Sequence, residues 1–181
     1  MSFKKFSKNF EGGVGFTLIE LLIVMAILGV LAVVVLVAIN PVQQLARTRD
    51  AGRKSGVAQL GRSLEAYYTA HGGSYIDEGA TWIQSLVTAG EISAIPSAIN
   101  PGVSGYTYCT ANPQSNWCYD ANPATGGSTA VIFTMLESDS EGSKCAAGTP
   151  WFVWSTFDGR GGLVCSGSEP VPAHQNWNTT Q

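Results

Sequence analysis

Residues 15–40, GFTLIELLIVMAILGVLAVVVLVAIN, form an apolar segment that contains one carboxylate, Glu20. From Leu21 to Ile39 the chain has 19 consecutive residues without a charge. As a helix that rises about 1.5 Å per residue, this run spans roughly 28 Å, close to the hydrocarbon core of a bilayer. The buried helix of a soluble protein is the alternative, but such helices rarely stay apolar on every side over this length. The segment therefore predicts a membrane span.

The residues in front of the span do not match an ordinary secretory signal. Such a signal has a shorter apolar region and ends in a small-residue cleavage site. Here the small residue, Gly15, comes before the apolar run, and residues 1–15 form a hydrophilic leader with three lysines. A cut after Gly15 would remove the leader and leave the anchor in the mature chain.

The order of residues at this point resembles a known family. Gly15, then Phe16-Thr17-Leu18-Ile19-Glu20 and an apolar helix, all after a short basic leader, is similar to the class III signal of type IV pilins and of type II secretion pseudopilins. The resemblance continues more loosely to about residue 76. It implies that prepilin peptidase cuts between Gly15 and Phe16 and methylates the new amine of Phe16.

Glu20 is the residue of the span that most needs an explanation. A carboxylate in a membrane helix is costly, by about 2.5–3.5 kcal/mol at the centre and less near an end. Glu20 lies four residues after Phe16, on the same helix face, and in the first turn, where the helix dipole favours an anion. The resemblance implies that it pairs with the N-terminal amine of a neighbouring subunit, so Phe16 and Glu20 are the expected assembly residues. An acid that merely marks the depth of the interface is the alternative.

The four cysteines predict the compartment of the distal part of the chain. None forms C-x-x-C, and only His71 and His174 could complete a zinc site, so two disulfides in an oxidising compartment are the preferred interpretation. The spacing favours Cys109–Cys118 and Cys145–Cys165, although three connectivities are possible. Basic residues flank the span almost equally, so the cysteines decide the orientation: leader in the cytoplasm, distal part outside.

The segment after the anchor is expected to be a helical stem. Pro41 removes a backbone hydrogen bond and disfavours helical geometry at Asn40, and with Gly29 it marks the window for a helix break. Residues 46–56 are polar all round, whereas a stripe for packing on a head domain recurs at helical spacing: Val57, Leu60, Leu64 and Tyr67. Three glycines weaken this helix, each by about 1 kcal/mol relative to alanine: Gly52, Gly56 and Gly61.

The rest of the chain predicts a small head. A short helix is expected near residues 82–87, followed by strand-like runs at residues 105–109, 117–121, 129–138, 150–157 and 162–166. The expected fold class is α+β, with a long N-terminal helix packed at its stem against an antiparallel β-meander, as in the pilin-like lollipop. The expected regions are leader 1–15, transmembrane and assembly helix 16–40, helical stem 41–72, head 73–165 and flexible tail 166–181.

The head carries little catalytic chemistry. It has no G-x-S-x-G, H-E-x-x-H or P-loop motif, so an enzyme is not predicted. From residue 63 onward ten acids face only Lys144 and Arg160, a balance that disfavours nucleic acid as a partner. Asp139 and Glu141 lie in a glycine-containing turn and are weak candidates for a calcium site, the one cofactor considered; a solvated loop is the alternative.

The sequence therefore predicts a structural subunit of a type IV pilus-like filament. The resemblance implies as partners other pilin subunits, prepilin peptidase, membrane lipid before assembly, and an inner-membrane assembly platform with its ATPase. The subunit would be a single-pass membrane protein first and part of an extracellular filament later. A pseudopilin of a type II secretion system, with a periplasmic filament, and a membrane-tethered binding domain that never polymerises are the alternatives.

Overall fold

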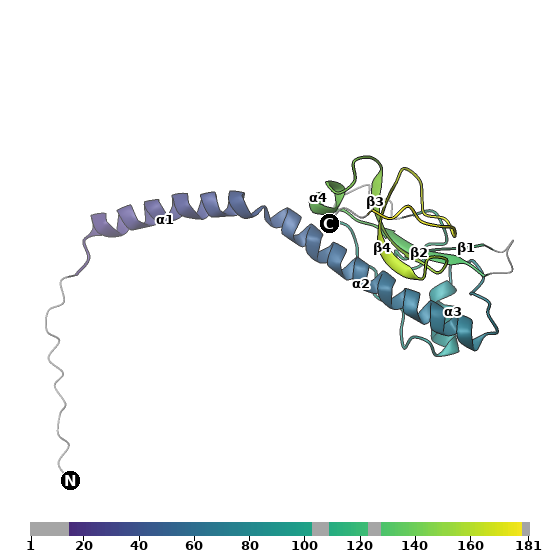
Figure 1. Ribbon diagram of the computed structural model, residues 1–181. Coiled ribbons are helices and arrows are strands. Elements are labelled where there is room, and N and C mark those ends of the chain that lie inside the picture. Colours follow the sequence, from purple (N-terminus) through teal and green to yellow (C-terminus); the bar gives the residue numbers. More distant parts are fainter. Residues whose placement is uncertain (1–14, 103–108, 123–127, 179–181) are drawn as a thin grey trace, which may run out of the picture. The chain divides into compact units, whose positions relative to one another are not determined.

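The structure, a computed structural model, describes residues 15–102, 109–122 and 128–178. The chain divides into two compact units, Met1–Pro41 and Val42–Gln181. Within the described residues, the first unit consists of helix α1 (Leu18–Ile39), and helix α2 (Pro41–Ala70) starts at the boundary. The remaining helices and a four-stranded sheet belong to the second unit (Figure 1).

Helix α1 ends where the sequence predicts a break. It runs through Gly29 without interruption and stops at Ile39, and Asn40 adopts the left-handed conformation with φ 45°. The next residue, Pro41, opens α2, the helix position that a proline tolerates best because no partner exists there for an N–H. Gly29 lacks this effect because a glycine still donates its backbone hydrogen bond, so it lowers helix stability without ending the helix.

Helix α2 is the longest helix of the second unit and packs along the sheet (Figure 1). Three residues of the predicted stripe, Val57, Leu60 and Leu64, are 0% exposed, and the fourth, Tyr67, is partly buried. Two of the three glycines of α2 contact tryptophan rings, and the third, Gly52, lies against Ile99. A Cβ atom added at Gly56 would lie 2.2 Å from the Trp117 ring, and one at Gly61 would lie 2.3 Å from the Trp154 ring. Glycine at these positions lowers the stability of the helix itself but lets the tryptophan rings pack directly on its backbone.

Helix α3 (Trp82–Ala89) follows a loop, at the expected place, and ends at Gly90, whose φ is 84°. The sheet is an antiparallel meander in the order β1 (Cys118–Ala121), β2 (Ala130–Met135), β3 (Thr149–Ser155) and β4 (Arg160–Ser166). Four of the five predicted strands are present, and residues 105–108 of the other lie outside the described residues. A one-turn helix, α4 (Asp139–Gly142), lies between β2 and β3. The predicted α+β class is confirmed.

The sheet is buried on both faces, following the alternation of side chains along its strands. One face meets the helices and includes Tyr119, Ile132 and Trp154, which pack with Leu60, Trp82 and others. The opposite face carries a second cluster: Cys109, Cys118, Val131, Phe133, Trp151, Val153 and Val164. The second cluster is covered by segments without regular structure, so the sheet is the middle layer of the unit.

The C-terminal segment differs from the expected flexible tail. As far as residue 178 it packs on β4: Trp177 pairs with Val164 and lies over Gly162, with the Arg160 guanidinium 4.4 Å from its ring centroid. The Asn178 N–H donates to the Leu163 carbonyl over 2.8 Å. Hydropathy periodicity could not reveal this packing because single side chains, rather than a repeating face, make the contacts.

Both outer strands of the sheet, β1 and β4, are contacted on their unpaired sides by other segments of the chain. At β4 the partner is the C-terminal segment just described. At β1 the Ala121 N–H donates to Glu78 over 2.9 Å, and the Tyr119 N–H donates to the Ala111 carbonyl over 3.4 Å. Nearby, the Tyr119 hydroxyl donates to the Ile76 carbonyl over 2.7 Å, so the loop before α3 is tied to the same strand.

Candidate functional site

The N-terminal end of α1 forms a capping box. Thr17 is the N-cap residue, and its backbone N–H and hydroxyl both donate to one Glu20 oxygen, each over 2.8 Å. The Glu20 N–H in turn donates to the Thr17 hydroxyl over 3.3 Å. Such reciprocal bonds satisfy N–H groups that have no partner inside a helix. The carboxylate is therefore held beside Phe16, the residue at the predicted cleavage point.

The cleavage point itself is open. Gly15 and Phe16 precede the helix without regular secondary structure, and Phe16 is 84% exposed. A Cβ atom added at Gly15 would meet nothing within 4 Å, so the glycine is not required by packing in this structure. The other residues of the predicted leader, 1–14, lie outside the described residues.

Helix α1 presents apolar side chains on every side. None of its residues is buried, and leucine, isoleucine and valine side chains are exposed along its whole length. Among the described residues, one helical run is long and apolar enough to cross a membrane, and it lies near the N-terminus. A helix without a polar face buries its surface only in lipid or against other chains.

Comparison with known families gives a match at the same residues. The family model of the prokaryotic N-terminal methylation motif matches residues 15–36. This chain carries the class III signal of type IV pilins and pseudopilins. The match starts at Gly15 and includes the capping box and most of α1, so the motif indicates a type IV pilin-like or pseudopilin precursor. No curated protein and no solved structure matches the chain.

The four cysteines of the chain form two disulfides. Cys109 is joined to Cys118, and Cys145 to Cys165, the pairs that the spacing favoured. The first links the loop before β1 to β1, and the second links the loop after α4 to β4. By chain entropy, closing loops between cysteines 9 and 20 positions apart in sequence stabilises the fold by roughly 3 kcal/mol each.

The two weak calcium candidates are arranged differently from a metal site. Glu141 is almost buried and is ion-paired with Lys54 at 2.7 Å and Lys144 at 3.3 Å. Burial would raise the pKa of Glu141, but the two ammonium groups hold it below its usual range. Asp139 is the first residue of α4, and its backbone N–H donates to the side-chain oxygen of Gln43 over 3.0 Å. In the part of the chain that the structure describes, no three His, Cys, Asp or Glu residues gather as a metal site would require.

A buried ionic cluster joins α2 to the segment after β2, and the sequence did not predict it. We name it the stem–head cluster: Arg49, Asp50 and Arg53 of α2 with Glu137. The side chains of Arg53 and Glu137 are each 1% exposed, and their atoms lie 3.1 Å apart. Arg49 also pairs with Glu137, and Asp50 with Arg53 at 2.7 Å.

The backbone completes the stem–head cluster. Asp50 accepts hydrogen bonds from the N–H groups of Glu137 and Ser138, at 3.0 and 2.9 Å, just before α4. Burial would raise the pKa of Glu137, but the hydrogen bond from Arg49, the Gly102 N–H and the charge of Arg53 hold it below its usual range. Residues 46–56 are polar all round in sequence, so a hydropathy pattern places them in solvent. The available signal was the i, i+3 spacing of Asp50 and Arg53.

Proposed function

We propose that this protein is a structural subunit of a type IV pilus-like filament, polymerised through α1. The observation that carries the proposal is the combination at the N-terminus: the methylation motif over residues 15–36 coincides with a helix whose apolar side chains are all exposed. In the precursor those side chains would be covered by lipid. In the filament the same surface would be covered by neighbouring α1 helices. The function requires no cofactor and no catalytic group of its own.

Processing comes first in the proposed sequence of events. Prepilin peptidase would cut between Gly15 and Phe16 and methylate the Phe16 amine. Gly15 and Phe16 are both exposed and lie outside the helix, which supports access of the peptidase to the bond between them. N-terminal peptide mapping of native protein tests this step. A mature chain that starts at Met1, or beyond the anchor, would contradict the filament function.

Glu20 would direct stacking after processing. Thr17 stays in the processed chain, so the capping box can persist, and both of its bonds to the carboxylate use the same oxygen, Oε2. The other oxygen is available in the described structure to a donor from another chain. The ammonium of a neighbouring Phe16, buried among apolar helices, is such a donor. Breaking a buried ion pair by removing one partner costs about 3–5 kcal/mol, which is enough to abolish assembly.

Two variants of Glu20 separate its capping role from its charge. Glu20→Ala removes both, whereas Glu20→Gln keeps the capping geometry, because glutamine also serves at this position of a capping box, and removes the charge. We expect stable, processed, membrane-inserted subunits and few or no filaments from both. Glu91→Ala, in the second unit, is the control and should assemble normally. The measurement is pelleted filament against membrane-bound subunit, and normal filament yield from Glu20→Gln would show that the charge does not direct stacking.

The place of the filament is the remaining part of the proposal. The leader would face the cytoplasm and the disulfide-bonded unit would lie outside, first on the inner membrane and then in an extracellular filament. Other pilin subunits, the assembly platform and its ATPase are the proposed partners. Electron microscopy of sheared surface material, with mass spectrometry of its subunits, tests this assignment. Recovery only from the periplasm would indicate a type II secretion pseudopilin, and recovery only as monomer in membranes would indicate a tethered binding domain.

A further inference from the structure

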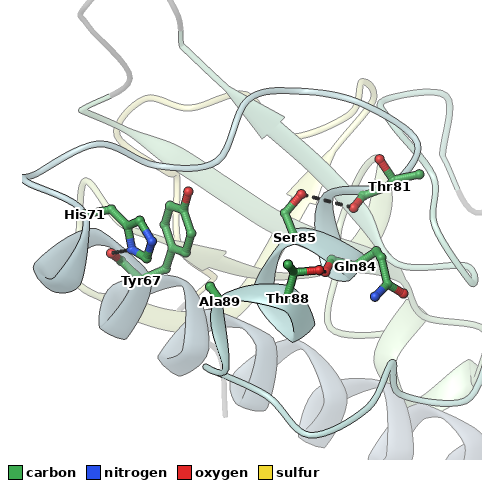
Figure 2. Close-up of a pocket in the computed structure, with 7 residues that line it drawn as sticks. All are labelled: Tyr67, His71, Thr81, Gln84, Ser85, Thr88 and Ala89. Atoms are coloured by element: carbon green, nitrogen blue, oxygen red, sulfur yellow. Dashed lines mark hydrogen bonds between the residues drawn. The ribbon is translucent and has the colours of Figure 1, made fainter.

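An open groove lies between the end of α2 and α3. Its volume is about 450 Å³, within the range of about 300–1,000 Å³ that small-molecule sites occupy. Figure 2 shows its lining: the rings of Tyr67, in the last turn of α2, and His71, just after α2, lie on one side. Polar side chains of α3 and of its N-cap residue, Thr81, lie on the other. The residues are Tyr67, His71, Thr81, Gln84, Ser85, Thr88 and Ala89.

The walls of the groove are held by the core. On α3 the apolar residues Trp82, Ile83 and Leu86 are at most 1% exposed, so the opposite face of the same helix must line the groove. On α2, Tyr67 packs against the core cluster, and its ring stacks on that of His71 with centroids 3.8 Å apart and planes 8° apart. The groove therefore exists without a ligand and needs little ordering to bind one.

The groove lacks charge in a strongly acidic part of the chain. Residues 79–90, which include all of α3, contain no Asp, Glu, Lys or Arg, although from residue 63 onward the chain has ten acids and two basic residues. The exposed face of a surface helix ordinarily carries charged residues. Here it carries threonine, serine and glutamine instead. An anionic or cationic ligand would find no counter-ion among the lining residues.

The hydrogen-bonding groups of the groove are biased towards acceptors. The Thr88 hydroxyl donates to the Gln84 carbonyl over 2.9 Å, and the Ser85 hydroxyl to the Thr81 carbonyl over 3.4 Å, so the oxygens offer lone pairs. His71 Nδ1 lies 3.0 Å from the Tyr67 carbonyl, which can only accept, so Nδ1 carries the proton. In the neutral ring Nε2 is then an acceptor.

We propose that this groove binds a neutral saccharide. A sugar brings many hydroxyl donors and no charge, which matches the acceptor-rich, uncharged lining. The C–H face of a sugar ring is apolar and fits against an aromatic ring, here one of the stacked pair. The exposed Gln84 amide supplies both a donor and an acceptor for the ring hydroxyls. The proposal is independent of polymerisation, because all lining residues belong to the second unit.

Saturation-transfer NMR on the full chain tests the proposal. The protein is placed in dodecylphosphocholine micelles, a detergent without a sugar headgroup, and the probes are maltotriose, cellotriose and triacetylchitotriose. We expect signal transfer to at least one of them, with a dissociation constant near or below about 1 mM. Absence of transfer to all three would overturn the proposal.

Matched variants decide whether the binding uses the groove. Thr88→Val removes one hydroxyl, and Thr69→Val is its control, because the exposed Thr69 also donates to a carbonyl of its own helix. Gln84→Glu introduces a charge, with exposed Gln59→Glu as its control. The groove variants should weaken binding roughly threefold to tenfold, the effect of one hydrogen bond, and the controls should not. Equal binding by groove variants and controls would overturn the assignment, and near-ultraviolet circular dichroism verifies that each variant is folded.

Discussion

Helices α1 and α2 follow one another in the chain but differ in polarity and in burial. Helix α1 is apolar except for Glu20 and buries none of its 22 residues in the protein. Helix α2 is polar on average, yet it buries eight of its residues, among them the ion-paired Asp50 and Arg53. Hydropathy alone would assign the burial in reverse. The comparison teaches that a helix without a second face needs partners from outside the chain, while charged residues can be buried where the chain supplies their counter-ions.

The largest expected effect comes from removing a buried cation of α2. Arg53→Met removes one positive charge next to the carboxylates of Asp50 and Glu137. The side chains of these three residues are at most 3% exposed, so water cannot replace the lost charge. Breaking such a pair costs about 3–5 kcal/mol, and because Arg49 remains we expect about 3 kcal/mol. The measurement is denaturant unfolding of the full chain, followed by tryptophan circular dichroism. Arg47→Met, at an exposed position of the same helix, is the control and should change stability little. A loss as small as that of the control would mean that the stem–head cluster does not hold α2 in place.

A smaller effect is expected from adding one methyl group to a glycine in each helix. At Gly61 the new Cβ would lie 2.3 Å from the Trp154 ring, whereas at Gly29 it would meet nothing within 4 Å. Gly61→Ala should therefore destabilise the second unit by about 1–3 kcal/mol, the usual cost of overpacking. Gly29→Ala should leave its unfolding unchanged. Equal stability of the two variants would contradict the comparison, because it would mean that Gly61 of α2 is packed no more closely than Gly29 of α1.

The smallest expected effect is a pH dependence confined to the second unit. Burial, a hydrogen bond with Glu78 and the charges of Glu78 and Glu169 raise the pKa of Asp120 from 3.8 to about 7. Between about pH 4 and pH 7 the folded chain thus binds a proton that the unfolded chain has released, so stability falls as pH rises through this window and then levels off. The lowered pKa of Glu78 acts in the opposite direction only at lower pH.

Thermal unfolding at a series of pH values checks this prediction. The melting temperature of the wild-type protein should drop by a few degrees between pH 5 and pH 8, beyond the change seen in Asp120→Asn. Asp77→Asn, at a nearby exposed acid, serves as the control and should keep the wild-type profile. If the profile of Asp120→Asn also matched the wild type, the pKa of Asp120 would not be raised by Glu78 and by burial in solution.

The sequence predicts best the elements that rest on a long pattern or a single strong signal. The apolar run predicts α1, Pro41 predicts the break, and the stripe Val57, Leu60 and Leu64 predicts the packed part of α2. It fails where contacts depend on pairs of distant residues. Arg53 finds Glu137, 84 residues away, and Gly61 matters because Trp154 lies over it. Neither partner is visible in a local pattern, and the packing of Trp177 on β4 was missed for the same reason.

The occupied outer strands have a consequence for how copies of this protein can meet. An exposed strand edge is a template on which another chain can extend the sheet, a common route to aggregation. Here the C-terminal segment covers one edge through Trp177 and Asn178, and Glu78 with Ala111 covers the other. Crowded side by side, as subunits of a filament would be, such units would meet at strand edges that other segments of their own chain already contact. Pairing of sheets between copies is thereby disfavoured, whereas α1 keeps its apolar side chains exposed and able to contact other helices.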